Sequence, residues 1–335
     1  MIQTLVATLM WALVASLLIF RRKRTDRNIT YAALAIAIAM TLGVDGIYTV
    51  VDPLLGGTNL ATLIADALLM TGLFFLGRGV MKSGEYRPRI VRAAVSVPML
   101  VISLLAIAGT FLFIERGLTT TQFMSDLGAQ PATAAYSIIT FVYGGIVIAT
   151  MLTLAARRYR HSTGIQRLPA ALLALGSTFG VALCLAVIVM DIAHVTGRLG
   201  LMYAVQPTYG PLSLLTFLFL CAGFAAQPAI RRAQHHLRDK RTAALAAQLE
   251  SLWNRATHVR PGLSQADPLA ASTEDPEGLL HREIVEIRDA MIDPRVTFDT
   301  SRTERALLER AESHLLGHNR TAAAPPTVED QDGAR

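Results

Sequence analysis

The chain has 335 residues, of which 52% are apolar and 17% charged, with a net charge of +6 and a mean hydropathy of +0.42. These values are atypical of a soluble domain of this length and typical of a membrane protein. The positive charge does not indicate a nucleic-acid-binding face, because the excess arginine lies in short loops beside apolar segments. There it acts as a topology signal and attracts anionic lipid.

Seven apolar stretches occupy residues 1–230, each close to the roughly 20 residues that a bilayer core requires. The first carries its basic residues after the apolar run and not before it, so we expect a retained helix and not a cleaved secretory signal. We predict transmembrane helices at Ile2–Phe20, Ile29–Val51, Asn59–Val80, Ala93–Ile114, Thr133–Ala156, Ala170–Val195 and Pro211–Ile230.

Basic residues alternate between the loops. The outward loops contain only Arg116 and Arg198. The inward segments contain Arg21–Arg27, then Arg78, Lys82, Arg87, Arg89 and Arg92, then Arg157, Arg158, Arg160 and Arg167, and finally Arg231 and Arg232. The positive-inside rule therefore predicts an all-α seven-helix bundle in the plasma membrane, with the N-terminus outside and the C-terminus in the cytoplasm.

Two features modify these helices. Pro98 is expected to kink the fourth helix, because proline removes a backbone hydrogen bond. Gly176 and Gly180 form a GxxxG face on the sixth helix, which indicates either close packing inside the bundle or a homodimer contact. We favour packing inside the bundle, because a seven-helix bundle contains many close internal contacts.

Residues 231–320 are expected to form a cytoplasmic helical domain, and the polar residues 321–335 a disordered tail. An amphipathic helix is predicted at His235–Val259, followed by a linker at Arg260–Ser272. A second helix begins near Pro276, and Ser301 with Glu304 makes a capping box for a third. These helices could form a small bundle, dock on the membrane domain or await a partner.

One apolar stripe runs along the second of these helices. It consists of Leu280, Ile284, Ile287 and Met291, at spacings of four, three and four residues, and Arg288 lies beside it. We predict that these residues form the contact surface for a cytosolic protein partner.

Three acids lie inside predicted helices. Asp45, Asp66 and Asp191 all fall in the outer third of the membrane, and His194 follows Asp191 by one turn. Charged groups in hydrocarbon usually face the bundle interior or a cavity, so the acids indicate a polar, outward-facing pocket for a cation, a proton or an amine. The alternative is that Asp45 forms a hydrogen bond with Tyr48 and that Asp191 and His194 pair with each other. Asp66 is then the best candidate, because it is the deepest of the three acids and has no obvious local partner.

Motifs for catalysis are missing from the sequence. No Walker motif or nucleotide-binding glycine motif occurs, and no lysine lies within a predicted span to form a retinal Schiff base. Because His194 is the only histidine in a predicted span, we expect no metal site. We therefore expect no enzymatic activity, no cofactor and no nucleic-acid partner.

Two segments carry a family resemblance. They are residues 51–63, Val-Asp-Pro-Leu-Leu-Gly-Gly-Thr-Asn-Leu-Ala-Thr-Leu, and residues 280–290, Leu-His-Arg-Glu-Ile-Val-Glu-Ile-Arg-Asp-Ala, preceded by Leu252-Trp253. In these segments and in its layout the chain resembles an actinobacterial family of multi-pass membrane proteins labelled as transporters, with an uncharacterised C-terminal domain. In that family a histidine often stands at the position of Asp66, which would change any role in proton or metal binding.

The sequence thus supports three hypotheses about function. The first is a seven-helix receptor-like sensor that couples an outward polar pocket to a cytosolic partner through its tail. The second is a secondary transporter of a small solute or cation, as the family label implies. The third is a scaffold that anchors the tail at the membrane.

Overall fold

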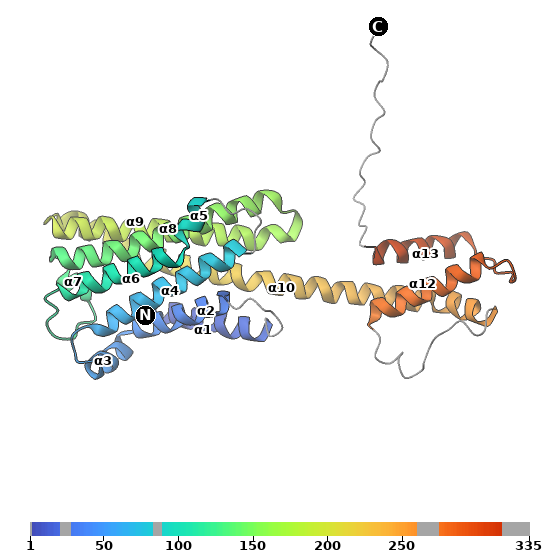
Figure 1. Ribbon diagram of the computed structural model, residues 1–335, viewed down its shortest axis with the longest axis horizontal. Coiled ribbons are helices and arrows are strands. Elements are labelled where there is room, and N and C mark those ends of the chain that lie inside the picture. The colour runs from blue at the N-terminus through green and yellow to red at the C-terminus, as the bar shows by residue number, and fades with distance from the viewer. Residues whose placement is uncertain (1, 21–27, 83–88, 260–274, 317–335) are drawn as a thin grey trace, which may run out of the picture. The chain divides into compact units, whose positions relative to one another are not determined.

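The computed structural model describes residues 2–20, 28–82, 89–259 and 275–316, and within these ranges the chain is helical and contains no strand (Figure 1). The chain divides into two compact units, Met1–Arg231 and Arg232–Arg335. Three predicted segments lie outside the described residues: the basic loop 21–27, the linker 260–272 and the C-terminal tail 321–335.

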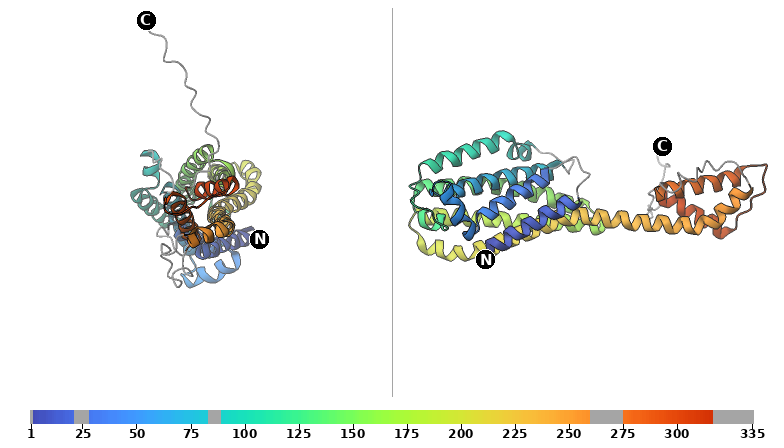
Figure 2. Two further views of the ribbon diagram at one scale, coloured as in Figure 1. Left: turned by 90° about the vertical axis from the view of Figure 1, so that its right-hand side faces the viewer. Right: turned by 90° about the horizontal axis from the view of Figure 1, so that it is seen from below.

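The first unit is a bundle of helices that run alternately in opposite directions (Figures 1 and 2). Its elements are α1 (Ile2–Phe20), α2 (Asn28–Leu42), α3 (Asp45–Leu54), α4 (Leu60–Lys82), α5 (Arg89–Ala94), α6 (Val97–Leu112), α7 (Phe123–Leu127), α8 (Pro131–His161), the 3-10 turn η1 (Gly164–Gln166), α9 (Arg167–Val195) and the first part of α10 (Leu199–Val259).

Five of the described helices are long and apolar enough to cross a membrane: α1, α4, α8, α9 and α10. A sixth span results if the bent pair α2 and α3 is counted as one. The remaining candidate is α6, whose 16 residues extend about 24 Å, less than the roughly 30 Å of a hydrocarbon core. The prediction of seven crossings therefore depends on α6 and stays a prediction.

The second predicted helix is broken in the structure. Residues 29–51 do not form one helix, because α2 ends at Leu42 and α3 leaves it at an angle of 88°. Gly43 and Val44 form the break, and Val44 adopts an extended conformation. Glycine is a weak helix former, so it allows the chain to turn at this point.

The fourth predicted helix is also broken, and Pro98 does not kink it. α5 ends at Ala94, and a new helix, α6, starts after Ser96, whose hydroxyl accepts a hydrogen bond from the Met99 amide at 3.3 Å. Pro98 lies in the first turn of α6, where its missing N–H costs nothing. The proline therefore helps to start a helix instead of bending one.

The last predicted loop is helical, and the seventh helix does not end before the tail begins. α10 is one helix of 61 residues that includes the predicted loop residues 199–210 and continues to Val259. The change from apolar to charged composition near Arg231 suggested a boundary, but no glycine or proline interrupts residues 229–259. A composition change does not break a helix, because lysine, arginine, glutamine and alanine all favour helical backbone.

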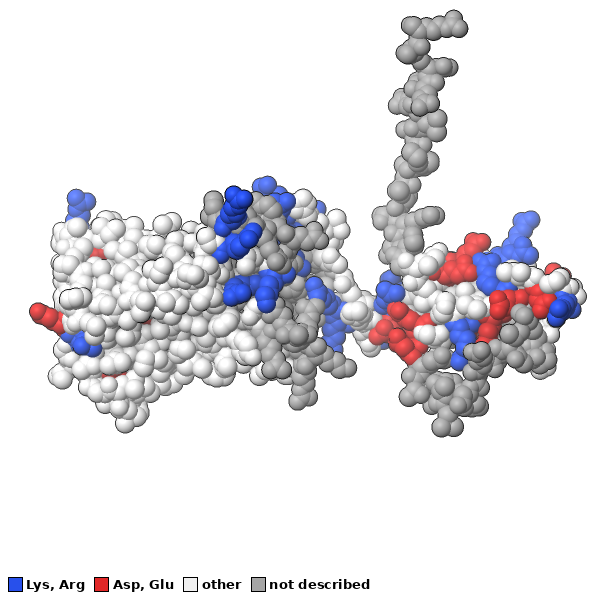
Figure 3. All heavy atoms as spheres, in the orientation of Figure 1, with Lys and Arg blue, Asp and Glu red and all other residues white. Residues whose placement is uncertain are grey.

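Basic residues of the first unit gather at one end of the bundle (Figure 3). α4 ends there with Lys82, α5 begins there with Arg89, α8 ends there with three basic residues in its last turn, and α9 begins there with Arg167. The loops at the opposite end contain Arg116 and Arg198. This asymmetry has the form that the positive-inside rule describes.

Glycines allow α8, α9 and α10 to pack closely. A Cβ atom at Gly176 would lie 2.8 Å from the backbone nitrogen of Leu220, and one at Gly180 would lie 3.0 Å from Ile148 and 3.1 Å from Thr216. Both glycines of the GxxxG face therefore contact neighbouring helices of the same chain. The interpretation as internal packing is confirmed, and the homodimer contact stays a prediction.

The second unit is a small bundle formed by the end of α10, α12 (Pro276–Ile292) and α13 (Arg302–Leu315). Leu249, Leu280, Ile287 and Leu308 form its buried core. The predicted capping box is present, since the Ser301 hydroxyl and the Glu304 carboxylate each accept a hydrogen bond from the other's amide. Of the three arrangements that the sequence left open, the bundle is the one observed.

The close contact at Gly176 leads to a stability prediction. Gly176→Ala should lower the unfolding temperature of the purified protein, because the new methyl group meets the backbone of α10 and overpacking costs about 1–3 kcal/mol. Gly109→Ala on α6 is the matched control, since a Cβ atom there meets nothing within 4 Å. Equal unfolding temperatures for the two variants would contradict the prediction.

Candidate functional site

The four predicted pocket residues lie on three different elements of the first unit, α3, α4 and α9. Asp45 is exposed at the start of α3, because the bend before it carries the chain away from α2. His194 is half-buried, and its ring lies against Gly128, where a Cβ atom would be 2.6 Å from Nδ1. Asp66 and Asp191 lie on different helices, α4 and α9. None of the four lines the principal cavity of the bundle.

Asp66 is held by a tyrosine from another helix. The Tyr136 hydroxyl on α8 donates a hydrogen bond to Asp66 Oδ2 at 2.6 Å. Tyr136 is fully buried and packs with Phe111 and Phe123, which fixes the position of its ring. The Asp66 side chain itself stays partly exposed. A positioned, partly accessible carboxylate of this kind can exchange a proton or attract a cation.

A buried polar network that the sequence analysis missed lies at the arginine-poor end of the bundle. Asp52, fully removed from solvent, accepts hydrogen bonds from the amides of Asn59 and Ala61, both at 3.0 Å, and from the Thr119 hydroxyl at 2.7 Å. The carboxylate thereby joins the end of α3, the start of α4 and the loop before α7. Three donors satisfy its buried charge.

Asn59 extends this network. Its side-chain amide donates to the carbonyls of Arg116 and Leu118 at 3.0 and 3.1 Å, and its Oδ1 accepts from the Tyr48 hydroxyl at 2.9 Å. The alternative interpretation of Asp45 expected a hydrogen bond with Tyr48. The Tyr48 hydroxyl instead forms hydrogen bonds with Asn59 and with the Thr62 hydroxyl. All hydrogen-bonding groups of the Asn59 side chain are thus used within the protein.

The backbone around this network adopts conformations that few residues tolerate. Gly56, Gly57 and Asn59 all have positive φ angles, of 105°, 66° and 61°. The asparagine and glycines of residues 51–63 therefore reflect a tight turn that brings Asn59 back onto Asp52. The pattern of aspartate, two glycines and asparagine was the available signal, because these residue types mark turns with local hydrogen bonds.

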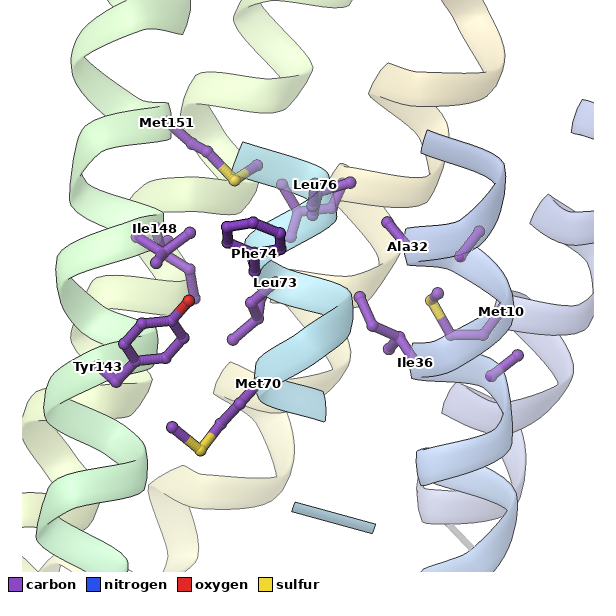
Figure 4. Close-up of a cluster of buried hydrophobic side chains, with 14 of the residues drawn as sticks. Met10, Ala32, Ile36, Met70, Leu73, Phe74, Leu76, Tyr143, Ile148 and Met151 are labelled. Atoms are coloured by element: carbon purple, nitrogen blue, oxygen red, sulfur yellow. The ribbon is translucent and has the colours of Figure 1, made fainter. Parts of the chain in front are cut away.

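The principal cavity of the first unit is apolar. It has a volume of about 100 Å³ and is lined by residues of α1, α2, α4, α8, α9 and α10. Figure 4 shows part of its wall, formed by Met10, Ile36, Met70, Leu73, Leu76 and Ile148. No charged residue contributes to the lining. This cavity is therefore not the polar pocket that the acids suggested, and that pocket stays a prediction.

Two hydroxyl groups of the lining form hydrogen bonds within their own helices. The Thr140 and Thr216 hydroxyls donate to carbonyls of their own helices, Tyr136 at 3.0 Å and Leu212 at 2.7 Å. A space of this composition favours apolar molecules over water or ions, because a water molecule needs several polar partners.

Seven of the lining residues lie on α10, between Tyr209 and Phe224. They are Tyr209, Ser213, Thr216, Phe217, Leu220, Cys221 and Phe224, whose spacings of three and four place them on one face of the helix. Farther along α10, Leu249 and Leu252 lie in the core of the second unit. One helix thus contributes to both the cavity and the core of the C-terminal bundle.

The predicted partner-binding residues are mostly internal. Leu280, Ile284 and Ile287 lie in the core of the second unit and Met291 packs against it, because α12 turns its apolar stripe towards α10 and α13. Arg288 binds Glu312 of α13 through two hydrogen bonds of 2.6 and 2.9 Å. The stripe is therefore occupied within the chain.

Glu283 is the most perturbed acid of the second unit. Burial raises the pKa of its carboxyl to about 7, and the charges of Glu250 and Glu286 add to the increase while Arg282 opposes it. Its Oε2 atom has no hydrogen-bond partner in the described part of the chain. The group lies near the contact of Trp253 with Glu286, so the environment of this tryptophan reports on the packing of α10 against α12.

Comparison of the chain with protein-family models, with curated proteins and with solved structures finds no match.

The network around Asp52 leads to a second stability prediction. Asp52→Ala should destabilise the protein by about 3 kcal/mol, because it leaves two buried amides without an acceptor. Asp45→Ala removes an exposed acid from the same helix and should change stability by less than about 0.5 kcal/mol. Thermal unfolding of both variants in the same detergent checks this, and a loss at Asp52 no larger than that at Asp45 would refute it.

Proposed function

We propose that the protein is a membrane sensor that detects an apolar molecule in its bundle and transmits the occupancy along α10 to its C-terminal helical unit. The observation that supports this proposal is that α10 lines the cavity with seven residues and, as one helix with Pro228 inside it, also contributes to the core of the second unit. In this proposal the N-terminus lies outside the plasma membrane and the C-terminal unit in the cytoplasm.

The cavity supports an apolar ligand instead of the cation or amine that the acids suggested. A protein helix bundle in lipid is surrounded by hydrocarbon, and an empty apolar space inside it can take up small hydrophobic molecules. Binding would shift the protein towards conformations in which α10 is displaced from α1 and α9. This displacement would change the contact between Cys221 on α10 and Met10 on α1, whose sulfur atoms lie 3.5 Å apart.

The C-terminal unit supports a role as an output module. It is a compact helical bundle without a catalytic motif in the sequence, so its output would be a change in binding to a cytosolic protein. Because the apolar stripe of α12 is buried, the exposed face of this helix is available for that contact. Val285 and Ile292 are exposed there, seven residues apart.

A variant that fills the cavity tests the proposal without a known ligand. Ser213→Phe places a ring in the cavity and should mimic the occupied state, whereas Leu218→Phe adds a ring at an exposed position on the outer side of α10. In a Trp11→Phe background, Trp253 is the only tryptophan and reports on the C-terminal unit. We expect its emission maximum to shift in Ser213→Phe and not in Leu218→Phe.

Two measurements make this test decisive. Thermal unfolding shows whether Ser213→Phe is folded, and Ser213→Leu provides a smaller filler if it is not. Hydrogen exchange of α12 and α13 should change in the same variants. Unchanged Trp253 emission together with unchanged exchange in a folded, filled protein would show that the cavity and the C-terminal unit are not coupled. The scaffold hypothesis would then gain support.

A secondary transporter is the competing function, and the hydrogen bond between Tyr136 and Asp66 favours it. A partly exposed carboxylate inside a helix bundle suits proton or cation coupling. If this function holds, proteoliposomes containing the wild-type protein should show proton or cation flux under an imposed gradient, and Asp66→Asn should abolish it.

Asp45→Asn is the control for the transport experiment, because it neutralises an acid that is exposed outside the bundle. Flux that survives in Asp66→Asn would remove this carboxylate from any coupling mechanism. The absence of flux from the folded wild-type protein under each imposed gradient would argue against proton or cation coupling and leave the sensor as the better description.

A further inference from the structure

Three buried oxygen atoms between α8 and α9 have no hydrogen-bond partner among the described residues. They are Oδ2 of Asp191, Oγ of Ser137 and Oγ1 of Thr133, and the three residues are 5%, 2% and 0% exposed. Buried polar atoms are almost always satisfied, and a buried carboxylate is especially costly without a partner. The cluster therefore indicates a bound species that completes it.

The packing of the two helices brings these residues together. A Cβ atom at Gly145 of α8 would lie 3.4 Å from Cys184 of α9, and one at Gly180 of α9 would lie 3.0 Å from Ile148 of α8. These contacts set the register of the two antiparallel helices. In this register Ser137 and Asp191 lie opposite each other, roughly 11 Å along the helix axes from the contact between Gly145 and Cys184. Ser137 is also the hydroxyl that lies against the Asp191 carboxylate. Thr133 precedes Ser137 by one turn on the same side of α8.

Neighbouring side chains do not neutralise the charge. Asp191 forms no ion pair in the part of the chain that the structure describes. His194, one turn further along α9, has its ring against Gly128. Asp66, whose partner Tyr136 precedes Ser137 on α8, already has the Tyr136 hydroxyl as its donor. The Asp191 site thus combines one negative charge with hydroxyl oxygens.

The chemistry of these oxygen atoms determines which ion fits the site. Divalent calcium or magnesium would need more oxygens and more charge, and among the described residues no cluster of three histidine, cysteine or acidic side chains could hold a metal ion. Zinc and copper prefer nitrogen and sulfur ligands, which are missing here. A single carboxylate with hydroxyls suits a monovalent hard cation, and the close approach of α8 and α9 favours a small one.

We propose that Asp191, Ser137 and Thr133 form a binding site for one sodium ion between α8 and α9. The site is separate from the apolar cavity, because none of the three residues lines that cavity. The proposal goes beyond the sensor function and does not depend on it. Bound sodium would join α8 to α9 and thereby stabilise the bundle, since a ligand that binds only the folded state raises its stability.

Thermal unfolding of the full-length protein in detergent tests this at constant pH and ionic strength. The unfolding temperature of the wild type should rise with the NaCl concentration when NaCl replaces choline chloride, and KCl should have a smaller effect. Asp191→Asn should abolish the response to sodium. Ser137→Ala retains the charge and should shift the response to higher NaCl concentrations.

Asp45→Asn is the matched control and should respond to sodium as the wild type does. If Asp191→Asn does not fold, broadening of the sodium NMR signal by the wild type, reduced in Ser137→Ala, is the second measurement. The proposal is wrong if the wild type unfolds at the same temperature in NaCl and choline chloride, which would leave a proton as the neutralising species. It is also wrong if Asp191→Asn keeps the full response.

Discussion

The continuity of α10 is the constraint on which the other features depend. Its first part packs on α1 and α9 and forms a large share of the cavity wall, and its last part supplies Leu249 and Leu252 to the C-terminal core. Pro207, Pro211 and Pro228 lie inside this helix and each removes one backbone hydrogen bond from it. α10 thus supplies residues to both units of the chain.

Polar groups in the first unit are arranged in two distinct ways. Asp52 and Asn59 are surrounded by donors and acceptors from the α3–α4 turn and the loop before α7, so they stabilise the arginine-poor end of the bundle. Asp66 and Asp191 are less completely satisfied, with one phenol hydrogen bond for Asp66 and an unpartnered oxygen for Asp191 within the described chain. The first pair is structural, and the second pair is where exchangeable protons or ions would act.

The cavity of the first unit is apolar, whereas the sequence analysis expected a pocket lined by acids. Three carboxylates at similar depth, with His194 nearby, suggested one pocket. In the structure these side chains have different neighbours. The bend after Leu42 exposes Asp45, Tyr136 of α8 donates to Asp66, and the ring of His194 lies against Gly128. The residue number gives the depth of a side chain along its helix. Which neighbouring helix that side chain faces depends on how the helices pack.

The sequence by itself determined the helical class, the positions of the apolar segments, the alternation of arginine and the capping box at Ser301, because each depends on composition or on spacings within one helix. It also indicated the boundary in composition near Arg231. Only the tertiary structure decided that α2 and α3 bend apart, that Pro98 starts a helix, and that α10 continues to Val259. The tertiary structure alone also brought Asp52 to Asn59 and Thr119, and Ser137 to Asp191. These outcomes depend on contacts between residues distant in sequence, whose free energy exceeds the small local preferences that a sequence pattern records.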